Sequence, residues 1–267
     1  MAYFPKFTLK PEVANYLVSI TEKVTSANLI HDIPDTAHGE LNLYLRKVNR
    51  IRSIQSSTAI EGNTLSLEQV TDVINGRPVK GNEREIKEVQ NAYAAYEAAL
   101  RLDPYQVANF LDIHKIMTQG LVGESGVFRT RQVGVFAGKQ LIHQGSHPAA
   151  VAGEISDLLA WAKSTDLHPL IKAAIVHFEI EYIHPFADGN GRMGRLWQTI
   201  ILAQWKPLFA WLPVETMIHA HQYKYYEVLQ NAEKTVDATE FIIFILQALQ
   251  QSLDEWLAAH PQDIAEK

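Results

Sequence analysis

The apolar residues of this chain recur at helical spacing, and this periodicity restricts the fold more than any other feature. Between positions 41 and 60, apolar side chains return every third or fourth residue, with arginine and lysine between them. This is the pattern of an amphipathic helix. The same period reappears at 83–100, 149–163, 169–183, 191–204 and 220–258. A break near 234–238 divides the last range into two helices, and the whole pattern predicts an all-α fold.

Local signals locate two helix starts. Ser66 and Gln69 have the spacing of a capping box, which predicts a short helix that ends at residue 74. Asp103 followed by Pro104 matches an N-cap with proline at the first helical position. This pair predicts a helix that runs from there through residue 117.

One glycine-rich stretch departs from the helical period. Residues 120–147 hold six of the 14 glycines, and the alternation over 133–136 and 140–143 predicts a small β-hairpin. No linker divides the chain into separate units. We expect one all-helical domain over 85–267 that carries the hairpin, preceded by an N-terminal helical extension over 1–84.

Composition excludes several classes of protein. The chain of 267 residues has no cysteine, which excludes disulfides, thiolate metal sites and cysteine nucleophiles. Its longest apolar run, 241–246, is far shorter than the ~20 residues of a membrane span, and its first residues lack a signal-peptide pattern. The net charge of −6 disfavours nucleic acid as a partner. We expect a cytoplasmic protein that binds neither membrane nor nucleic acid.

The segment IHPFADGNGRMGR gathers groups that bind phosphates. The proline after His184 disfavours helical geometry there, so the preceding helix ends at this residue. Gly189, Asn190 and Gly191 then allow several backbone N–H groups to converge where the next helix begins. A helix N-terminus adds positive partial charge, so this loop predicts an anion site.

Charged side chains surround that loop. Arg192 and Arg195 lie three residues apart on the first turn of the new helix and bring two guanidinium groups to the anion site. Asp188 offers a hard oxygen ligand for Mg²⁺, and His184 is a base with a suitable pKa range. Each residue alone is ordinary at a helix–loop–helix turn. Together they predict phosphoryl or nucleotidyl transfer.

Residues 184–195 match the Fic-domain signature His-Pro-Phe-x-(Asp/Glu)-Gly-Asn-Gly-Arg-x-x-Arg at every specified position. The resemblance extends over about 85–250 and includes a Gly-x-Phe-Arg element at 126–129. It implies the helical Fic fold and a protein adenylyltransferase. Such an enzyme moves AMP from ATP to a Tyr, Ser or Thr hydroxyl of a target protein, and of itself, and releases pyrophosphate. Gly191 argues against the Doc-like branch, which carries lysine there and phosphorylates its target.

The resemblance implies a role for each motif residue. His184 takes the proton from the acceptor hydroxyl, and Asp188 holds the Mg²⁺ that arrives with ATP. The expected nucleotide-binding residues are Gly189, Asn190, Gly191, Arg192, Met193, Gly194, Arg195 and Tyr226.

Tyr226 is chosen for the adenine slot from three tyrosines on one helix, at 223, 225 and 226. Some relatives continue with Asn-Glu-Gly-Asp, whereas this chain has Ala-Glu-Lys-Thr at 232–235. The far wall of the base pocket is therefore not fixed by the resemblance.

The hairpin resembles the flap that aligns the target in Fic enzymes. Strand addition gives register through main-chain hydrogen bonds and makes little demand on the target's sequence. The expected docking residues are Val133, Gly134, Val135 and Phe136. The alternative is a hairpin that only covers the core.

A second motif precedes the domain. Ser57 and Glu61 match the (Ser/Thr)-x-x-x-Glu-(Gly/Asn) motif of the Fic inhibitory helix, at the end of a helix over about 41–62. In such proteins (class II) the glutamate pairs with the second motif arginine, here Arg195. The resemblance therefore implies an autoinhibited enzyme. In some relatives this glutamate also supports the removal of AMP from the modified protein. The sequence leaves open whether Glu61 does the same here.

Other functions fit parts of the same pattern. The donor could be UTP or another nucleotide, and the fold could serve as a non-catalytic nucleotide-binding interaction module. The sequence leaves open whether the chain forms a homodimer, and it does not identify the target protein. His177, Glu181 and His184 share one helix face and resemble half of a di-iron site, but no second Glu-x-x-His exists. We therefore expect His177 to be a histidine of the hydrophobic core and Glu181 to be an acidic residue on the helix surface.

Overall fold

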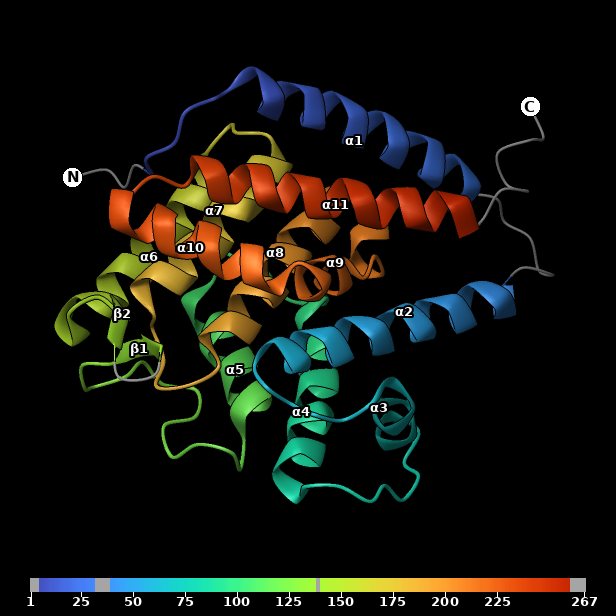
Figure 1. Ribbon diagram of the computed structural model, residues 1–267, viewed down its shortest axis with the longest axis horizontal. Helices are drawn as coiled ribbons and strands as arrows, with labels where there is room; N and C mark the ends of the chain where they lie inside the picture. Colours follow the sequence, from blue (N-terminus) through green and yellow to red (C-terminus); the bar gives the residue numbers. More distant parts are fainter. Residues whose placement is uncertain (1–4, 32–38, 138–139, 260–267) are drawn as a thin grey trace.

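The computed structural model describes residues 5–31, 39–137 and 140–259. Within these ranges the regular structure is helical apart from one hairpin, which confirms the predicted all-α fold (Figure 1). The helices are α1 (Pro11–His31), α2 (Gly39–Ile60), α3 (Leu67–Ile74), α4 (Glu83–Ala99), α5 (Val107–Thr118), α6 (Pro148–Ser164), α7 (Pro169–Ile183), α8 (Asn190–Trp205), the 3₁₀ turn η1 (Pro207–Ala210), α9 (Val214–Ala220), α10 (Gln222–Thr235) and α11 (Thr239–Ala259).

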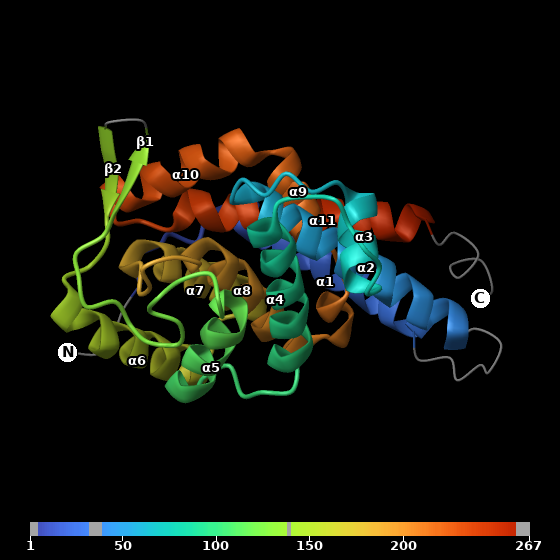
Figure 2. The same cartoon turned by 90° about the horizontal axis from the view of Figure 1, so that it is seen from below.

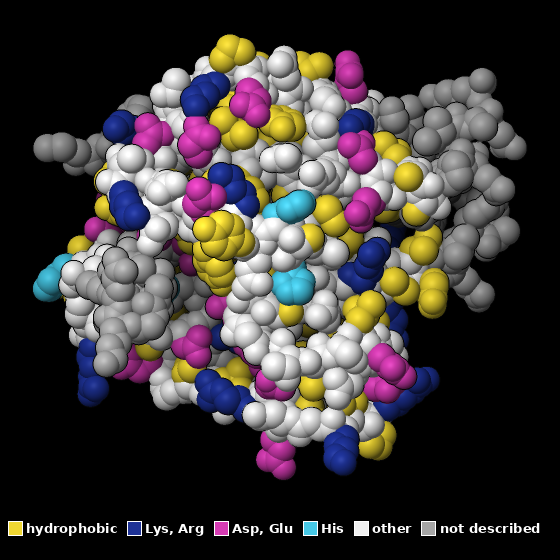
Figure 3. Space-filling view, viewed as in Figure 1, with side chains coloured by type: hydrophobic (Ala, Val, Ile, Leu, Met, Phe, Trp, Pro, Cys, Tyr) yellow, Lys and Arg dark blue, Asp and Glu magenta, His cyan; other side chains and the backbone are white. Residues whose placement is uncertain are grey.

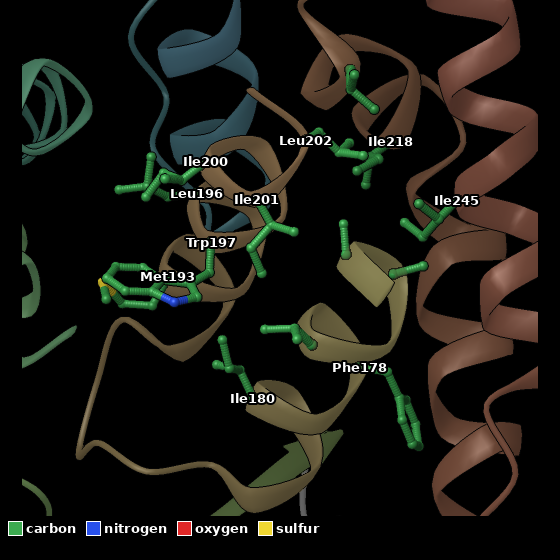
Figure 4. Close-up of a cluster of buried hydrophobic side chains, with 14 of the residues drawn as sticks. Phe178, Ile180, Met193, Leu196, Trp197, Ile200, Ile201, Leu202, Ile218 and Ile245 are labelled. Atoms are coloured by element: carbon green, nitrogen blue, oxygen red, sulfur yellow. The ribbon is translucent and has the colours of Figure 1, made fainter. Parts of the chain in front are cut away.

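Helices α7 and α8 form the centre of the molecule. α7 is apolar on nearly all of its faces, and such a helix is stable only when other elements surround it. It packs against α6, α8 and α11, and its buried side chains belong to one core cluster with those of α8, Ile218 of α9 and Ile245 of α11 (Figure 4). The motif loop, defined here as residues 184–189, joins these two helices, so both of its ends are anchored in the core.

The N-terminal segment packs against the C-terminal helices. α1 lies alongside α11 in both views (Figures 1 and 2). Ahead of it, Ala238 N–H donates to the carbonyl of Lys6 at 2.9 Å, and Thr8 N–H donates to Thr239 Oγ1 at 2.8 Å. α2 packs against α4, α8 and α9. The domain boundary expected at residue 84 stays a prediction.

The capping box at the start of α3 is confirmed. Gln69 N–H donates to Ser66 Oγ at 3.2 Å, and Ser66 N–H donates back to Gln69 Oε1 at 2.9 Å. These two hydrogen bonds satisfy N–H groups that have no partner within the helix.

The helix start expected at Asp103 is wrong, because α5 begins at Val107. Asp103 Oδ1 accepts the N–H of Tyr105 at 2.9 Å within an isolated turn. The carbonyl of Pro104 accepts Nε1–H of Trp197 at 2.9 Å, so a long-range hydrogen bond holds this segment outside the helix. The helical pattern over 220–258 does break as predicted, between α10 and α11, but the preceding short helix α9 was not anticipated.

The predicted hairpin is present. Strands β1 (Gly134–Ala137) and β2 (Gln140–Gln144) pair antiparallel, with Gly134 opposite Gln144 and an irregular register after the second residue of β1. Such an irregularity bends a strand and increases its twist. The hairpin projects at one edge of the molecule, next to α10 (Figure 2).

The visible face of the molecule carries acidic and basic side chains interspersed with apolar ones (Figure 3). Among the described helices, none combines the length and the apolar character needed to cross a bilayer.

Trp197 offers a test of the core. Its side chain is fully buried and packs edge-on against Phe110 with ring centroids 4.8 Å apart. We expect Trp197→Ala to lower the free energy of unfolding by ~3–5 kcal/mol, because a large cavity opens and a buried hydrogen bond is lost. Urea unfolding measures this change. Val18→Ala on the exposed face of α1 is the control and should change stability by less than ~0.5 kcal/mol. Equal effects of the two would contradict the packing described.

Candidate active site

A cleft of about 550 Å³ opens beside the motif loop, bounded by the end of α2, by α10 and by the hairpin. Its lining is rich in carboxylates and contains one arginine. The lining residues are Glu61, Gly134, Glu181, His184, Ala187, Asp188, Gly189, Asn190, Gly191, Arg195, Tyr223, Tyr226, Glu227, Leu229, Gln230 and Glu233.

His184 ends α7 in the left-handed conformation, with φ 53° and ψ 61°. Its N–H donates to the carbonyl of Ile180 at 3.0 Å, and its ring Nδ1 lies 3.3 Å from the carbonyl of Glu181. A carbonyl oxygen only accepts, so Nδ1 carries the hydrogen of this contact. In the neutral ring, Nε2 is then the nitrogen that can take up a proton.

Arg129 binds the backbone around His184. Its Nε donates to the carbonyl of His184 at 2.6 Å and its Nη2 to the carbonyl of Ile183 at 3.3 Å. The Arg129 N–H also donates to the carbonyl of Pro185 at 3.1 Å. Carbonyl groups at a helix end have no partner within the helix, and Arg129 satisfies two of them here. The Gly-x-Phe-Arg element is visible in the sequence, but its pattern alone does not indicate this role for Arg129.

The side chain of Asn190 closes the motif loop. Its Oδ1 accepts the N–H of Phe186 at 2.9 Å, and its Nδ2 donates to the carbonyl of the same residue, also at 2.9 Å. Gly189, at φ 87°, makes the turn into α8. The side chain of Asn190 is therefore occupied within the loop, whereas the backbone N–H groups at the start of α8 face the cleft side of the loop as donors for an anion.

His114 of α5 supports the same loop and was not predicted as a site residue. It is fully buried, its Nε2 lies 3.0 Å from the carbonyl of Asp188, and its Nδ1 accepts the N–H of Gly126 at 3.0 Å. Burial lowers the pKa of His114 to about 4, although the hydrogen bond to Asp188 opposes this shift. A lone histidine within a helical pattern gave no signal in the sequence.

The two motif arginines have different surroundings. Arg192 is nearly buried behind the loop and does not line the cleft. Its Nη2 donates to Asp188 Oδ1 at 3.2 Å, and its Nη1 forms an ion pair with Glu88 of α4. The other carboxylate oxygen of Glu88 accepts Nδ2–H of Asn63 at 2.8 Å, which links Arg192 to the turn after α2.

Arg195 is held by the residues of the second motif. Its Nη2 donates to Glu61 Oε1 at 2.6 Å and to the carbonyl of Ser57 at 3.0 Å, while its Nε donates to Ser57 Oγ at 3.1 Å. Arg195 is only 1% exposed. Burial is the largest single influence and lowers the pKa of this guanidinium, but Glu61, Tyr225 and Glu181 together outweigh burial and the pKa is raised.

Backbone geometry permits this contact. A Cβ at position 191 would collide with Glu61 Oε1, so glycine is required there for Glu61 to approach. The end of α2 is fixed as well, because Tyr226 OH and Gln222 Nε2 both donate to the carbonyl of Ile60, at 3.1 and 3.0 Å.

Met193 and Gly194 do not line the cleft. The side chain of Met193 is fully buried in the core (Figure 4). Gly194 faces His177, whose Cδ2 would lie 2.7 Å from an added Cβ. The nucleotide contacts expected of both residues stay predictions.

Glu181 is not the surface acid that we expected, because it is 8% exposed and lies in the cleft wall. Tyr225 OH lies 3.1 Å from both Glu181 Oε1 and His177 Nε2, and His177 Nδ1 lies 2.8 Å from Gln198 Oε1. His177 is a core histidine as predicted. Burial raises the pKa of Glu181 to about 7, although Arg195 opposes the shift.

The tyrosines of α10 separate into two groups. Tyr225 is buried, whereas Tyr223 and Tyr226 are 86% and 44% exposed and line the cleft. Glu233 lies in the same wall, and burial together with Glu181 raises its pKa to about 8. Glu233 was not predicted as a site residue, although it lies in the stretch 232–235, where the sequence departs from the Asn-Glu-Gly-Asp pattern that the resemblance would lead us to expect.

Asp188 is the expected metal ligand. Its carboxylate is 44% exposed and lies 3.7 Å from Nη2 of Arg84. No group of three or more acidic or histidine side chains in the described part of the chain is placed to hold a metal ion. Mg²⁺ commonly binds through one or two carboxylates together with substrate phosphates. The donor set therefore fits a Mg²⁺ ion that arrives with a polyphosphate.

The structure gives the surroundings of two of the four predicted docking residues. Gly134 lines the cleft, and Val133 next to it is half-buried. The side chains of Val135 and Phe136 lie outside what the structure describes.

The geometry defines a loop between two buried helices, with a helix N-terminus at its end and a histidine on its rim. Comparisons with known proteins agree. The Fic/DOC family model matches residues 104–202. The protein adenylyltransferase Fic of Aedes aegypti is 31% identical over 239 residues, which cover 82% of this chain and 45% of that protein.

Solved structures agree as well. The crystal structure of a Fic family protein from Desulfovibrio desulfuricans G20 has a TM-score of 0.88 and 47% identity, over 96% of this chain and 77% of that one. Residues 134–508 of Fic-1 from C. elegans have a TM-score of 0.71 at 22% identity, over 93% of this chain and 74% of that one.

The chain therefore belongs to the Fic/DOC family. It spans about half the length of the curated relatives that it matches.

Glu181 predicts a pH dependence of stability. The native protein keeps a proton on Glu181 up to about pH 7, whereas the unfolded chain releases it near the ordinary value of 4.5. Stability therefore falls as pH rises through this window, by up to ~1.4 kcal/mol per pH unit. Glutamine does not titrate, so the Glu181→Gln variant lacks this loss of stability. The difference in free energy of unfolding between the variant and the parent should therefore shift in favour of the variant from about pH 5 to 7 and stay constant above pH 7. Urea unfolding across this range measures the difference, and a constant difference would contradict the buried, protonated state.

Proposed function

We propose that this chain is a protein adenylyltransferase that moves AMP from ATP to a hydroxyl side chain of a target protein and is inhibited by Glu61. The observation that carries the proposal is a single cleft that brings together His184, Asp188, the start of α8 and Arg195. The names of the relatives and the complete Fic signature support the same activity.

His184 serves as the base. Its Nε2 takes the proton of the acceptor hydroxyl, and the oxygen then bonds to the α-phosphorus while the bond to the leaving pyrophosphate breaks. The Nδ1–H contact with the carbonyl of Glu181 supports this assignment, because it leaves Nε2 to act as the base.

Phosphates bind at the start of α8. Backbone N–H groups of Gly189–Gly191 and the positive end of the helix stabilise the charge of the transferred and leaving groups. Arg195 offers a further donor, since its Nη1 is buried without a hydrogen-bond partner among the described residues. Mg²⁺ bound by Asp188 and the phosphates would neutralise charge on the leaving pyrophosphate.

The target segment pairs with the hairpin. The position of Gly134 in the cleft lining supports this, because it places strand β1 next to the reacting groups. Main-chain pairing would present the acceptor hydroxyl to His184 with little demand on sequence. The target remains unidentified, and the cytoplasm is the compartment that we expect for it.

Glu61 inhibits transfer by holding Arg195. While Nη2 of Arg195 donates to Glu61 and to the carbonyl of Ser57, this nitrogen cannot bind the terminal phosphate of ATP, and the carboxylate adds negative charge where phosphates must lie. A displacement of ~1 Å at the reacting atoms lowers a rate about a hundredfold. The intact chain should therefore transfer AMP slowly.

Self-labelling with ATP that carries the label on the α-phosphate tests this proposal. We expect Glu61→Gly to be labelled about 10- to 100-fold faster than the parent, and the combination with His184→Ala to be unlabelled. Glu68→Gly, an exposed glutamate of α3, is the control and should behave as the parent does.

Each remaining outcome favours another function. Labelling with UTP but not with ATP would show that UTP is the nucleotide donor. ATP binding without transfer by any variant would indicate a non-catalytic interaction module. Labelled protein that retains Glu61 could also lose AMP faster than labelled Glu61→Gly protein. That result would show that Glu61 supports the removal of AMP as well.

A further inference from the structure

We propose that His114 is a positioning residue whose two ring nitrogens fix the motif loop against α5 and so orient Asp188 toward the nucleotide's phosphates and metal. The inference deepens the proposed function and rests on it, because it concerns the same loop.

The hydrogen-bond partners define the state of the His114 ring. The carbonyl of Asp188 can only accept, and the N–H of Gly126 can only donate. The ring must therefore be neutral, with its hydrogen on Nε2 and an acceptor lone pair on Nδ1. This is the one tautomer that satisfies both backbone groups.

Ring stacking adds a second point of attachment to the loop. The imidazole lies parallel to the ring of Phe186, with centroids 3.5 Å apart and an interplanar angle of 4°. Both backbone polar groups of Phe186 are bound by the side chain of Asn190. His114 thus holds the loop at the side chain of residue 186 and at the carbonyl of residue 188, on either side of its turn.

The other edge of the ring holds the Gly-x-Phe-Arg element. Gly126 has φ 75°, and a Cβ there would lie 2.6 Å from Cβ of Lys115, so this segment lies directly against α5. Three residues later, Arg129 binds the carbonyl of His184. His114 therefore connects α5 to both the segment that holds His184 and the loop that carries Asp188.

These contacts explain why a histidine occupies this position. Phenylalanine would keep a flat ring on Phe186 but would remove the ring nitrogens that bind the N–H of Gly126 and the carbonyl of Asp188. Glutamine offers a donor and an acceptor but no ring. The two substitutions therefore separate hydrogen bonding from stacking.

Hydrogen exchange without nucleotide is the first test. We expect His114→Phe to accelerate exchange about tenfold at the amides of Gly126 and of residues 186–190, because the loop loses its attachment. His114→Gln should restore part of the protection. His168→Phe is the matched control, since it also removes a histidine nitrogen that accepts a backbone N–H, that of Leu170 at the far end of α7. It should leave the loop unchanged.

Calorimetry of ATP binding with and without Mg²⁺ is the second test. The background is Glu61→Gly with His184→Ala, which prevents turnover. We expect His114→Phe to reduce the gain in ATP affinity that Mg²⁺ provides by about tenfold or more, and to change the Mg²⁺-free affinity little. A merely structural defect would lower both affinities together.

The inference is overturned if His114→Phe keeps the exchange rates and the Mg²⁺ gain within about twofold of the parent, or if His168→Phe causes the same changes. If the background protein binds no ATP at all, the proposed function fails. Hydrogen exchange in the absence of nucleotide still decides the role of His114 in that case.

Discussion

Arg195 carries a permanent charge into the interior, and the arrangement of the cleft depends on how that charge is compensated. A guanidinium that is 1% exposed requires an anionic or well-placed polar partner, because burial of an unpaired charge is strongly unfavourable. Ser57 and Glu61 provide that partner at the end of α2. In the proposed reaction, a phosphate group would provide it instead. The competition between these two anions for one guanidinium is our explanation for autoinhibition.

The competition requires a motif loop that keeps its shape whichever anion is bound. Its ends are fixed by the burial of α7 and α8, and its turn is closed by the side chain of Asn190. Arg129 and His114 bind its carbonyl groups from outside. Backbone N–H groups at the start of α8 are thus held in place before any ligand arrives, which is the condition for strong electrostatic stabilisation of phosphates.

Features determined by local sequence could be predicted. The helical period located α7 and α8, the glycines and asparagine marked the loop, and Ser66 with Gln69 placed the start of α3. The contact between Arg195 and Glu61 followed from the resemblance to Fic proteins, because two short motifs far apart in the sequence give no distance by themselves.

Features that depend on distant partners could not be predicted. Asp103 starts no helix because the indole of Trp197 binds the next carbonyl. Glu181 is buried because Tyr225, on another helix, supplies its hydrogen bond. His114 had no informative spacing, and its role is visible only once Gly126 and Asp188 lie on opposite edges of its ring. The site was thus recognisable from its motif, whereas the residues that hold the motif in place were not.

Calorimetric binding of ATP, ADP and AMP to the His184→Ala protein, with and without Glu61→Gly, tests the central claim most directly. If Glu61 and the terminal phosphate compete for Arg195, removal of Glu61 should raise ATP affinity about tenfold or more, equivalent to ~1.4 kcal/mol. The affinity for AMP, which lacks the outer phosphates, should change by less than about twofold. An equal gain for all three nucleotides, or no gain for ATP, would contradict the account.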